Sequence, residues 1–301
     1  MKGIHVMEEK LNRSEKPLFL WGAANAGEGF ISIISSTYLS YFLTDVALLP
    51  LNISTIVMLI TSVAAFIMST VAGGIIASVK PMKWGRLRSW LLVGPPIAVT
   101  FFTLHFVSVP EHPILSAVII SIGYIMGISA WNFAFAANIS LTNLLAKTQK
   151  DRNIYNSQRM MGSNLGRLMG NYLTPVIVAF LRPMLGERAS YPVLVLVAGI
   201  FYIATEQFHF KLANGAEENY TAHEYNVNDS EDSLNFKEIF KSLSTNSQLL
   251  VTVLIDLSSN MAALALPSLA VYYYKYVFEA PQMVSVHMLA IGLAGFAGST
   301  F

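Results

Sequence analysis

Residues 52–79 read NISTIVMLITSVAAFIMSTVAGGIIASV, a run without a single charged side chain. The hydrocarbon core of a bilayer is about 30 Å thick, so a helix that crosses it needs about 20 consecutive, mostly apolar residues. This run satisfies both conditions. Comparable runs lie at 17–45, 90–109, 113–146, 156–181, 191–210, 249–278 and 281–301. The sequence therefore predicts seven complete transmembrane helices and an eighth that stops with the chain.

The composition agrees with this interpretation. The 301 residues are 54% hydrophobic and 12% charged, with a mean hydropathy of +0.52. A soluble domain carries about 25% charged residues, and one soluble core could not bury so much apolar surface. The net charge of +1 provides no field that would attract nucleic acid, and the lack of cysteine excludes disulfides and thiolate chemistry. We expect an integral membrane protein whose partner is the lipid bilayer.

The distribution of basic residues predicts the orientation in the membrane. Fourteen of the 19 Lys and Arg residues lie in the N-terminal tail and in the connections after the second, fourth and sixth spans. The opposite connections hold only Arg182, Arg188 and Lys275. Basic residues are enriched on the cytoplasmic side. We therefore expect a multi-pass protein of the plasma membrane with its N-terminus in the cytoplasm.

The order of the spans suggests a division into four parts. Residues 1–16 form a cytosolic tail, 17–213 a six-helix bundle, 214–248 a cytosolic linker, and 249–301 the first two helices of a second, incomplete bundle. Apolar residues at 234, 236, 239, 240 and 243 favour a short amphipathic helix in the linker, although a solvated linker remains an alternative. The layout resembles a major-facilitator-type helical bundle, an all-α membrane fold, and we expect the chain to be truncated.

Four stretches narrow this resemblance. They are Thr37–Val46 (TYLSYFLTDV), Lys83–Gly94 (KWGRLRSWLLVG), Asp151-Arg152 followed by Ser157–Gly166 (SQRMMGSNLG), and Tyr272–Val277 (YYYKYV). In this order they resemble the glycoside–pentoside–hexuronide:cation symporter family, the melibiose-permease-like branch of the major facilitator superfamily. The resemblance implies twelve helices around a central pathway and the transport of sugars or glycosides, commonly coupled to sodium or protons.

The sequence departs from that family where its coupling ion would bind. The two acids that the family carries on its second helix correspond to Phe66 and Thr70. Its ligand on the first helix corresponds to Gly29, and its acid on the fourth to Ala134 or Phe135. A hard cation needs oxygen ligands, preferably anionic ones. We therefore expect no family-type sodium coupling, which leaves the proton as the candidate coupling ion.

Few ionisable side chains lie inside the predicted spans, where insertion costs roughly 2.5–3.5 kcal/mol each, and we select four of them as candidates for function. Glu28 lies mid-span among glycines, and we interpret it as a solute- or proton-binding residue or one half of a structural ion pair. Arg159 matches, by resemblance, the family's sugar-binding arginine, although it could equally reach the headgroups. Arg167 and Asp256 are either site residues or structural partners.

Glu28 and Arg167 are expected to lie at a similar depth. At 1.5 Å per residue, Glu28 lies about 16 Å and Arg167 about 18 Å from the cytoplasmic edge of its helix. Opposite charges at one depth in a low dielectric should meet. We predict an ion pair between them, either direct or bridged by solute hydroxyls, with Asp256 as the rival partner of Arg167.

Uncharged side chains complete the predicted site. Amides can bind sugar hydroxyls, although they more often join helices to each other. Trp131 could stack on a sugar ring, whereas Trp21 is expected in the interfacial aromatic belt. A stripe of small residues on the fifth helix, Gly162, Gly166 and Gly170, predicts close helix packing. The amides that we select as candidates are Asn25, Asn132, Asn138 and Asn164.

The sequence thus predicts a secondary transporter that moves a small polar solute, a sugar or a glycoside, by alternating access. It contains no P-loop, dinucleotide fingerprint or metalloprotease motif, so we expect no enzyme activity, no cofactor and no metal site. The alternative is a truncated, non-transporting membrane protein, either a remnant or a sensor. A reading frame that stops after Phe301, without complementing helices elsewhere, would favour that alternative.

Overall fold

The computed structural model describes residues 20–146, 148–217 and 246–298, and the regular structure of these ranges is helical. The predicted tail 1–16 and amphipathic segment 234–243 lie outside the described residues. The domain boundaries at 17, 213, 214, 248 and 249 remain predictions. The helices are α2 (Ala26–Thr37), α3 (Leu39–Tyr41), the π-helical η1 (Phe42–Val46), α4 (Leu51–Ser78), α5 (Arg88–His105), α6 (Pro113–Leu145), α7 (Gln149–Leu212), α9 (Ser247–Tyr276) and α10 (Met283–Gly298).

Every predicted apolar run contains one of these helices or a limb of one. Three described stretches are long and apolar enough to cross a membrane by themselves, namely Leu51–Ile76, Pro113–Leu145 and Gln149–Leu212. The last stretch, α7, covers two predicted spans because helical geometry resumes at once after Gly186, whose φ of 77° breaks the helix there. Only glycine adopts a positive φ without strain. The break divides α7 into a first limb, 149–185, and a second limb, 187–212.

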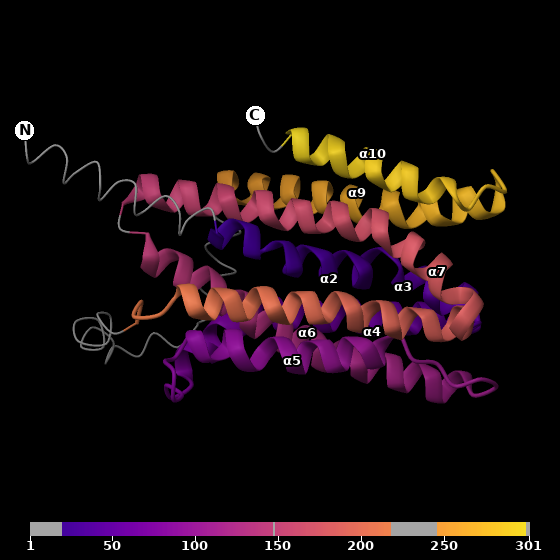
Figure 1. Cartoon of the computed structure of the whole chain (residues 1–301), viewed down its shortest axis with the longest axis horizontal. Helices are drawn as coiled ribbons and strands as arrows, with labels where there is room; N and C mark the ends of the chain where they lie inside the picture. Colours follow the sequence, from indigo (N-terminus) through magenta and orange to yellow (C-terminus); the bar gives the residue numbers. More distant parts are fainter. Residues whose placement is uncertain (1–19, 147, 218–245, 299–301) are drawn as a thin grey trace, which may run out of the picture.

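The helices run side by side along the long axis of the molecule (Figure 1). One end of the bundle holds the turn between the two limbs of α7, η1 and the connection from α9 to α10. We call it the Gly186 end, after the residue at that turn. The opposite end holds the start of α5 and the end of α7. We call it the Leu20 end, because Trp21, which follows Leu20, contacts His209 near the end of α7.

Buried apolar side chains form two clusters. The larger one includes Ile34, Phe42 and Phe106, and it extends to Val271 of α9 and Met288 of α10. The smaller one, towards the Leu20 end, surrounds Trp21, which is 1% exposed and meets Tyr155 edge to face. Trp21 is therefore a core residue, and its predicted interfacial position is wrong. Its indole fills the space between α2 and both limbs of α7. Burial of this large apolar surface lowers the free energy of the folded state.

Glycines bring α2 and the first limb of α7 into backbone contact. A Cβ atom on Gly162 would lie 1.7 Å from the carbonyl oxygen of Gly22, and one on Gly166 would lie 1.9 Å from that of Ala26. At Gly170 the nearest atom would be Ile33 Cγ2, at 2.2 Å. The predicted packing stripe is confirmed, because no larger side chain fits at these positions.

The connection between α4 and α5, which contains the stretch Lys83–Gly94, is bonded to the end of α7. The Glu217 carboxylate accepts hydrogen bonds from the backbone N–H groups of Leu87 and Arg88 at 2.8 and 3.2 Å, and so caps the start of α5. The Arg88 guanidinium donates to the Phe210 carbonyl oxygen at 3.0 Å. These bonds join the third predicted span to the sixth at the Leu20 end.

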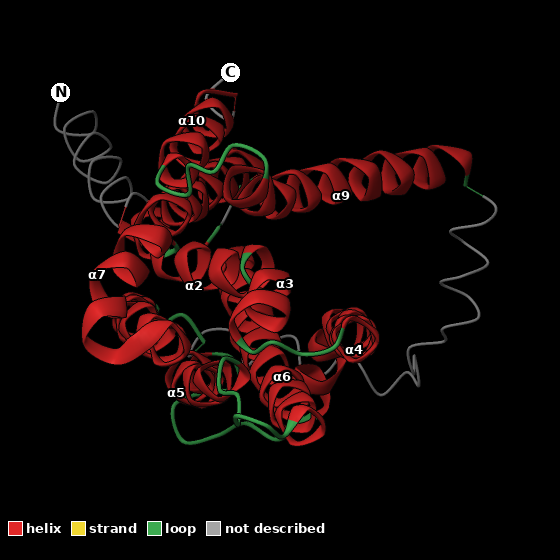
Figure 2. Ribbon diagram, turned by 90° about the vertical axis from the view of Figure 1, so that its right-hand side faces the viewer, coloured by secondary structure: helices red, strands yellow, loops and turns green. Residues whose placement is uncertain are grey.

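Helix α9 packs on the bundle near one end only, as far as its described side chains show. From 247 to 266 every one of them is exposed, whereas Ala270 and Val271 are buried. Viewed along the bundle, α9 leans away from α2 and α4 towards its Ser247 end (Figure 2). In contrast, α10 lies against the first limb of α7, with Gly292 directly over Leu168. The bundle and α9 are thus joined at the Gly186 end and separate towards the Leu20 end.

Candidate functional site

The close contact of α2 with α7 positions Glu28 in the interior of the bundle. Its side chain is 5% exposed, and it lies one residue before Gly29. A Cβ atom at position 29 would lie 2.0 Å from the Ser163 carbonyl oxygen, so no side chain fits there. The cation ligand that the resembled family would place at this position is therefore excluded by packing as well as by sequence.

Glu28 and Arg167 do not form the predicted ion pair. Both side chains are described, no ion pair or hydrogen bond joins them, and Arg167 is exposed while Glu28 is buried. The direct form of the prediction is wrong because similar depth does not ensure a shared face. Among the charged side chains around Glu28, Arg159 has the strongest electrostatic interaction with its carboxyl group, followed by Glu206 and Arg167. The form bridged by solute hydroxyls remains a prediction.

Arg159, Phe135 and Trp131 form a stacked platform between α6 and the first limb of α7. The Arg159 guanidinium carbon lies 4.7 Å from the centre of the Phe135 ring. On α6, the rings of Trp131 and Phe135 stack nearly parallel, with 4.8 Å between their centres. Within the described part of the chain, neither Arg159 Nε nor Trp131 Nε1 has a hydrogen-bond acceptor. Both atoms are buried, and aromatic rings beside a guanidinium are groups that can contact a sugar ring and its hydroxyls.

Two of the predicted amides belong to a different group, which we call the His209 cluster. It consists of Asn25 on α2, Asn138 on α6, and Glu206 and His209 on the second limb of α7. Asn138 Nδ2 lies 3.1 Å from His209 Nδ1, and Asn25 Nδ2 lies 3.3 Å from Nε2. All four side chains are buried. The cluster joins three helices, which agrees with the alternative role of interhelical contact proposed for these amides.

The other candidates are dispersed. Asn132 donates to the Ile128 carbonyl oxygen of its own helix at 2.8 Å. Asn164 is half-buried on the first limb of α7. The backbone of Asp256 lies in α9, and its side chain lies outside the described part of the structure. The structure thus brings Arg159 near Trp131 and Asn25 near Asn138, and it leaves the remaining candidates apart.

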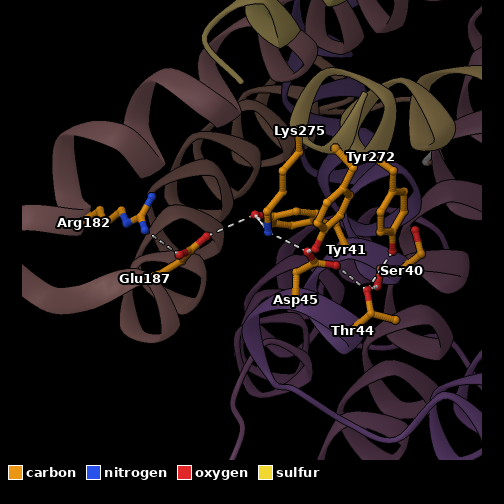
Figure 3. Close-up of polar contacts among 9 residues, drawn as sticks. Ser40, Tyr41, Thr44, Asp45, Arg182, Glu187, Tyr272 and Lys275 are labelled. Atoms are coloured by element: carbon orange, nitrogen blue, oxygen red, sulfur yellow. Dashed lines mark hydrogen bonds and ion pairs between the residues drawn. The ribbon is translucent and has the colours of Figure 1, made fainter. Parts of the chain in front are cut away.

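A polar network closes the Gly186 end between the bundle and α9 (Figure 3). Lys275 Nζ of α9 lies 2.5 Å from Asp45 Oδ1 of η1, and it donates to Tyr41 Oη at 3.1 Å. Tyr41 Oη in turn donates to Glu187 Oε1 at 3.2 Å, and Glu187 pairs with Arg182 at 3.2 Å. These five residues come from η1, α3, both sides of the Gly186 break and α9.

Two further contacts extend the network. Thr44 Oγ1 lies 2.6 Å from Asp45 Oδ2 and 2.9 Å from Tyr272 Oη, and Tyr276 Oη also donates to the Asp45 carboxylate. The Asp45 side chain is 4% exposed, whereas that of Lys275 is 34% exposed. A nearly buried carboxylate with this many donors is firmly held, so the network fixes the end of α9 to the first bundle.

A cavity of about 630 Å³ lies beside this network. Its walls come from α2, α3, both limbs of α7, α9 and α10, and they are largely apolar with polar groups at a few points. Tyr38, Tyr41, Tyr172, Tyr191, Lys275 and Gln282 supply aromatic rings and hydrogen-bonding groups. None of the predicted site residues with a described side chain lines it. The volume suffices for a small solute.

Sequence reasoning did not select the residues of the network, of the cavity or of the Glu206–His209 pair. A signal for the network was present, because Asp45 and Lys275 lie in two of the four family-like stretches, Thr37–Val46 and Tyr272–Val277. The sequence signal for the Glu206–His209 pair was weaker, since it consists of an acid and a histidine three residues apart inside an apolar run. Neither signal specifies a spatial partner.

Comparison with known proteins adds independent information. The sequence pattern of the family described as MFS/sugar transport protein matches residues 20–301. The chain is 25% identical over 298 residues to the uncharacterized symporter YjmB of Bacillus subtilis (strain 168), covering 98% of the chain and 62% of that protein. It is 24% identical over 258 residues to the uncharacterized symporter YnaJ of the same organism, covering 83% of the chain and 52% of that protein. The chain therefore spans between half and two thirds of the length of these relatives.

Proposed function

Because the chain belongs to the MFS/sugar transport protein family, we propose that it acts in a secondary transporter that carries a sugar or a glycoside across the plasma membrane. The proposed mechanism is alternating access, in which two helix bundles expose a solute site first on one side of the membrane and then on the other. The similarity to two proteins named as symporters supports a transporter rather than an enzyme.

The observation that carries this proposal is the asymmetric contact of α9 with the first bundle. The Asp45–Lys275 pair holds α9 at the Gly186 end, and α9 departs from the bundle towards the Leu20 end. A transporter that works by alternating access must adopt a state that is closed at one end and open at the other. With the N-terminus in the cytoplasm, as the basic residues favour, this state is closed to the outside.

We propose that the solute contacts the platform of Arg159, Phe135 and Trp131. Arg159 Nε and Trp131 Nε1, which have no acceptor in the described part of the chain, support this assignment, and Glu28 is close enough to be influenced by the Arg159 charge. Asn164, Arg167 and Asp256 remain proposed contributors from the same faces or from the second bundle. The cavity beside the Asp45–Lys275 network is the proposed outer part of the pathway.

We further propose that sodium does not drive transport. Phe66 is 73% exposed, and the Thr70 hydroxyl donates to the Phe66 carbonyl oxygen at 2.9 Å within the same helix. Together with the lack of space at Gly29, these positions offer no set of anionic oxygen ligands. A proton needs no coordination shell, and buried carboxyl groups such as that of Glu28 can carry one.

Uptake measurements test the proposal. Membrane vesicles from cells that express the gene are supplied with a panel of labelled glycosides and sugar acids, and vesicles from cells without the gene are the control. We expect saturable uptake of at least one compound, and a strong reduction by Arg159→Lys, which keeps the charge but removes the planar fork. Absence of uptake of every compound, with the protein present in the membrane, would favour the non-transporting alternative.

A further inference from the structure

The His209 cluster contains two titratable groups that the proposed solute site does not use. His209 is 0% and Glu206 is 2% exposed, and they lie one helical turn apart on the second limb of α7. Glu206 Oε2 lies 3.3 Å from His209 Nδ1. Asn25 and Asn138 surround the imidazole from α2 and α6. An acid and a base are therefore in contact inside the protein.

The proton on one imidazole nitrogen can be assigned from its neighbour. His209 Nε2 lies 2.9 Å from the carbonyl oxygen of Trp21. A carbonyl oxygen only accepts hydrogen bonds, so Nε2 must carry a proton at this distance. The Asn25 amide donates to the same oxygen at 3.0 Å, which fixes that oxygen as an acceptor for both groups.

The second nitrogen, Nδ1, faces both the Glu206 carboxyl group and the Asn138 amide, whose Nδ2 lies 3.1 Å away. The amide donates to Nδ1 when Nδ1 carries no proton, and it must turn its oxygen to Nδ1 when Nδ1 is protonated. If Nδ1 carried no proton and Glu206 were ionised, a lone pair and a negative charge would meet at 3.3 Å without solvent, which is costly. One proton between the two removes the conflict, either on Nδ1 as an imidazolium–carboxylate pair or on Glu206 as a neutral acid. We propose that Glu206 and His209 hold one shared proton and form a proton-binding site within the first bundle.

The surroundings fit a site that gains and loses this proton. Two amide oxygens of the cluster, Asn25 Oδ1 and Asn138 Oδ1, have no hydrogen-bond donor among the described residues. They offer acceptors to a donor such as an entering water or a relocated proton. A cluster that served only to join helices would be expected to satisfy these oxygens.

Charges on the neighbouring elements connect the pair to the proposed solute site. Glu28 on α2 interacts electrostatically with Glu206 and His209, and also with Arg159 and Arg167 on the first limb of α7. Tyr202, on the same limb of α7 as Glu206, also interacts with both acids. Two acids that share one region repel each other when both are ionised. Loss of the shared proton is therefore sensed at Glu28, and through it at Arg159.

This connection gives the proton a role in transport, and that role rests on the proposed function. A proton bound at the pair reduces the negative charge near Glu28, whereas its release increases that charge and strengthens the attraction of Glu28 for Arg159. Binding of a solute by Arg159 and occupancy of the proton site are thus coupled, and the coupling is reciprocal.

Nitrogen-15 NMR of the histidine-labelled protein in detergent tests the shared proton directly. In the wild type at pH 7 we expect one of the six imidazoles to have a protonated Nε2 and an Nδ1 that shares a proton. His209→Asn should remove this signal and so assign it. His105→Asn is the matched control, because His105 is equally buried, its Nδ1 lies 2.9 Å from the Ile120 carbonyl oxygen, and its ring packs against Phe106 and Tyr124 rather than against a described acid.

Glu206→Gln supplies the decisive variant. An amide cannot share the proton, so the His209 Nδ1 signal should move to the range of a simple acceptor, while Glu28→Gln should leave its form unchanged. A wild-type spectrum in which no imidazole has a shared Nδ1 proton overturns the proposal without any variant. A His209 signal that is the same in the wild type and in Glu206→Gln also overturns it.

Uptake driven by an imposed proton gradient tests the coupling separately. With a glycoside from the panel, Glu206→Gln should abolish accumulation against a gradient and retain downhill exchange. Accumulation by the variant equal to that of the wild type would refute the coupling. If no glycoside is transported by either protein while the NMR signature is present, the proposed function fails and the proton site stands.

Discussion

Asp45 and Lys275 are 230 residues apart in the sequence, yet their side chains form an ion pair with 2.5 Å between oxygen and nitrogen. The pair joins the end of the first helix of one bundle to the end of the first helix that follows the linker. Tyr41 and Thr44 hold the two partners from the side of the bundle. Because the carboxylate is nearly buried, breaking the pair leaves an anion without its cation, which is the costly state.

We predict that Asp45→Asn opens the Gly186 end. A hydrogen bond to a charged group contributes about 1.5–3 kcal/mol, which corresponds to a population change of about tenfold or more. Spin labels at Leu48 and Val277, both exposed near the pair, should report longer distances by pulsed electron resonance. Arg182→Gln, which removes only the exposed outer member of the network, is the control. An exchange of the two charges, Asp45→Lys with Lys275→Asp, should restore the short distance.

We predict that Gly166→Ala prevents normal folding. Its Cβ atom would lie 1.9 Å from the Ala26 carbonyl oxygen, and backbone at that position cannot move aside easily. The loss of stability should exceed about 3 kcal/mol, which is large for a single methyl group. Gly73→Ala is the matched control, since nothing lies within 4 Å of the added atom. Thermal stability of the purified protein in detergent measures both, and equal melting of the two variants would contradict the packing argument.

We predict that uptake is independent of sodium. The positions that would need carboxylates hold Phe66 and Thr70, and Thr70 is already bonded within its own helix. Initial rates should be equal in sodium and potassium buffers of the same ionic strength. A saturable increase with sodium at constant ionic strength would refute this prediction, whereas a dependence on external pH would not.

We predict that changing Glu28 and Arg167 together gives no rescue. The charges of Glu28 and Arg167 interact only at a distance, because the side chains form no ion pair or hydrogen bond and Arg167 is exposed, so the two changes should act nearly independently. The double variant Glu28→Gln, Arg167→Gln should express at the level given by the product of the two single effects. Better expression of the double variant than of the worse single variant would indicate a coupling that the geometry does not contain.

We predict that the linker between the bundles is cytosolic. The chain contains no cysteine, so Ser230→Cys, in the part of the linker outside the described residues, introduces a unique label site. An impermeant thiol reagent should label it only after the membrane is permeabilised. Labelling of intact cells would reverse the orientation and, with it, the assignment of the Gly186 end to the outside.

The sequence predicted the helices well because each apolar run is long and the turns between them are polar. It also predicted the glycine stripe, since spacing four along a helix defines a face. It did not predict that Trp21 is buried, because tryptophan suits both an interface and a core. It could not predict the Asp45–Lys275 pair or the His209 cluster, because contacts between distant helices depend on rotations that periodicity does not fix. The same reason explains the failure of the direct Glu28–Arg167 pair.

Because α9 is attached to the bundle near one end, a small rotation there moves its other end by a large distance. The helix has 30 residues, or about 45 Å at 1.5 Å per residue. Its packed portion begins near Pro267, and its described side chains before that are exposed. A rotation of roughly 10° about Lys275 would displace the Ser247 end, about 42 Å away, by roughly 7 Å. A small change of angle at the Asp45–Lys275 pair would therefore become a displacement of nearly a helix width at the other end of α9.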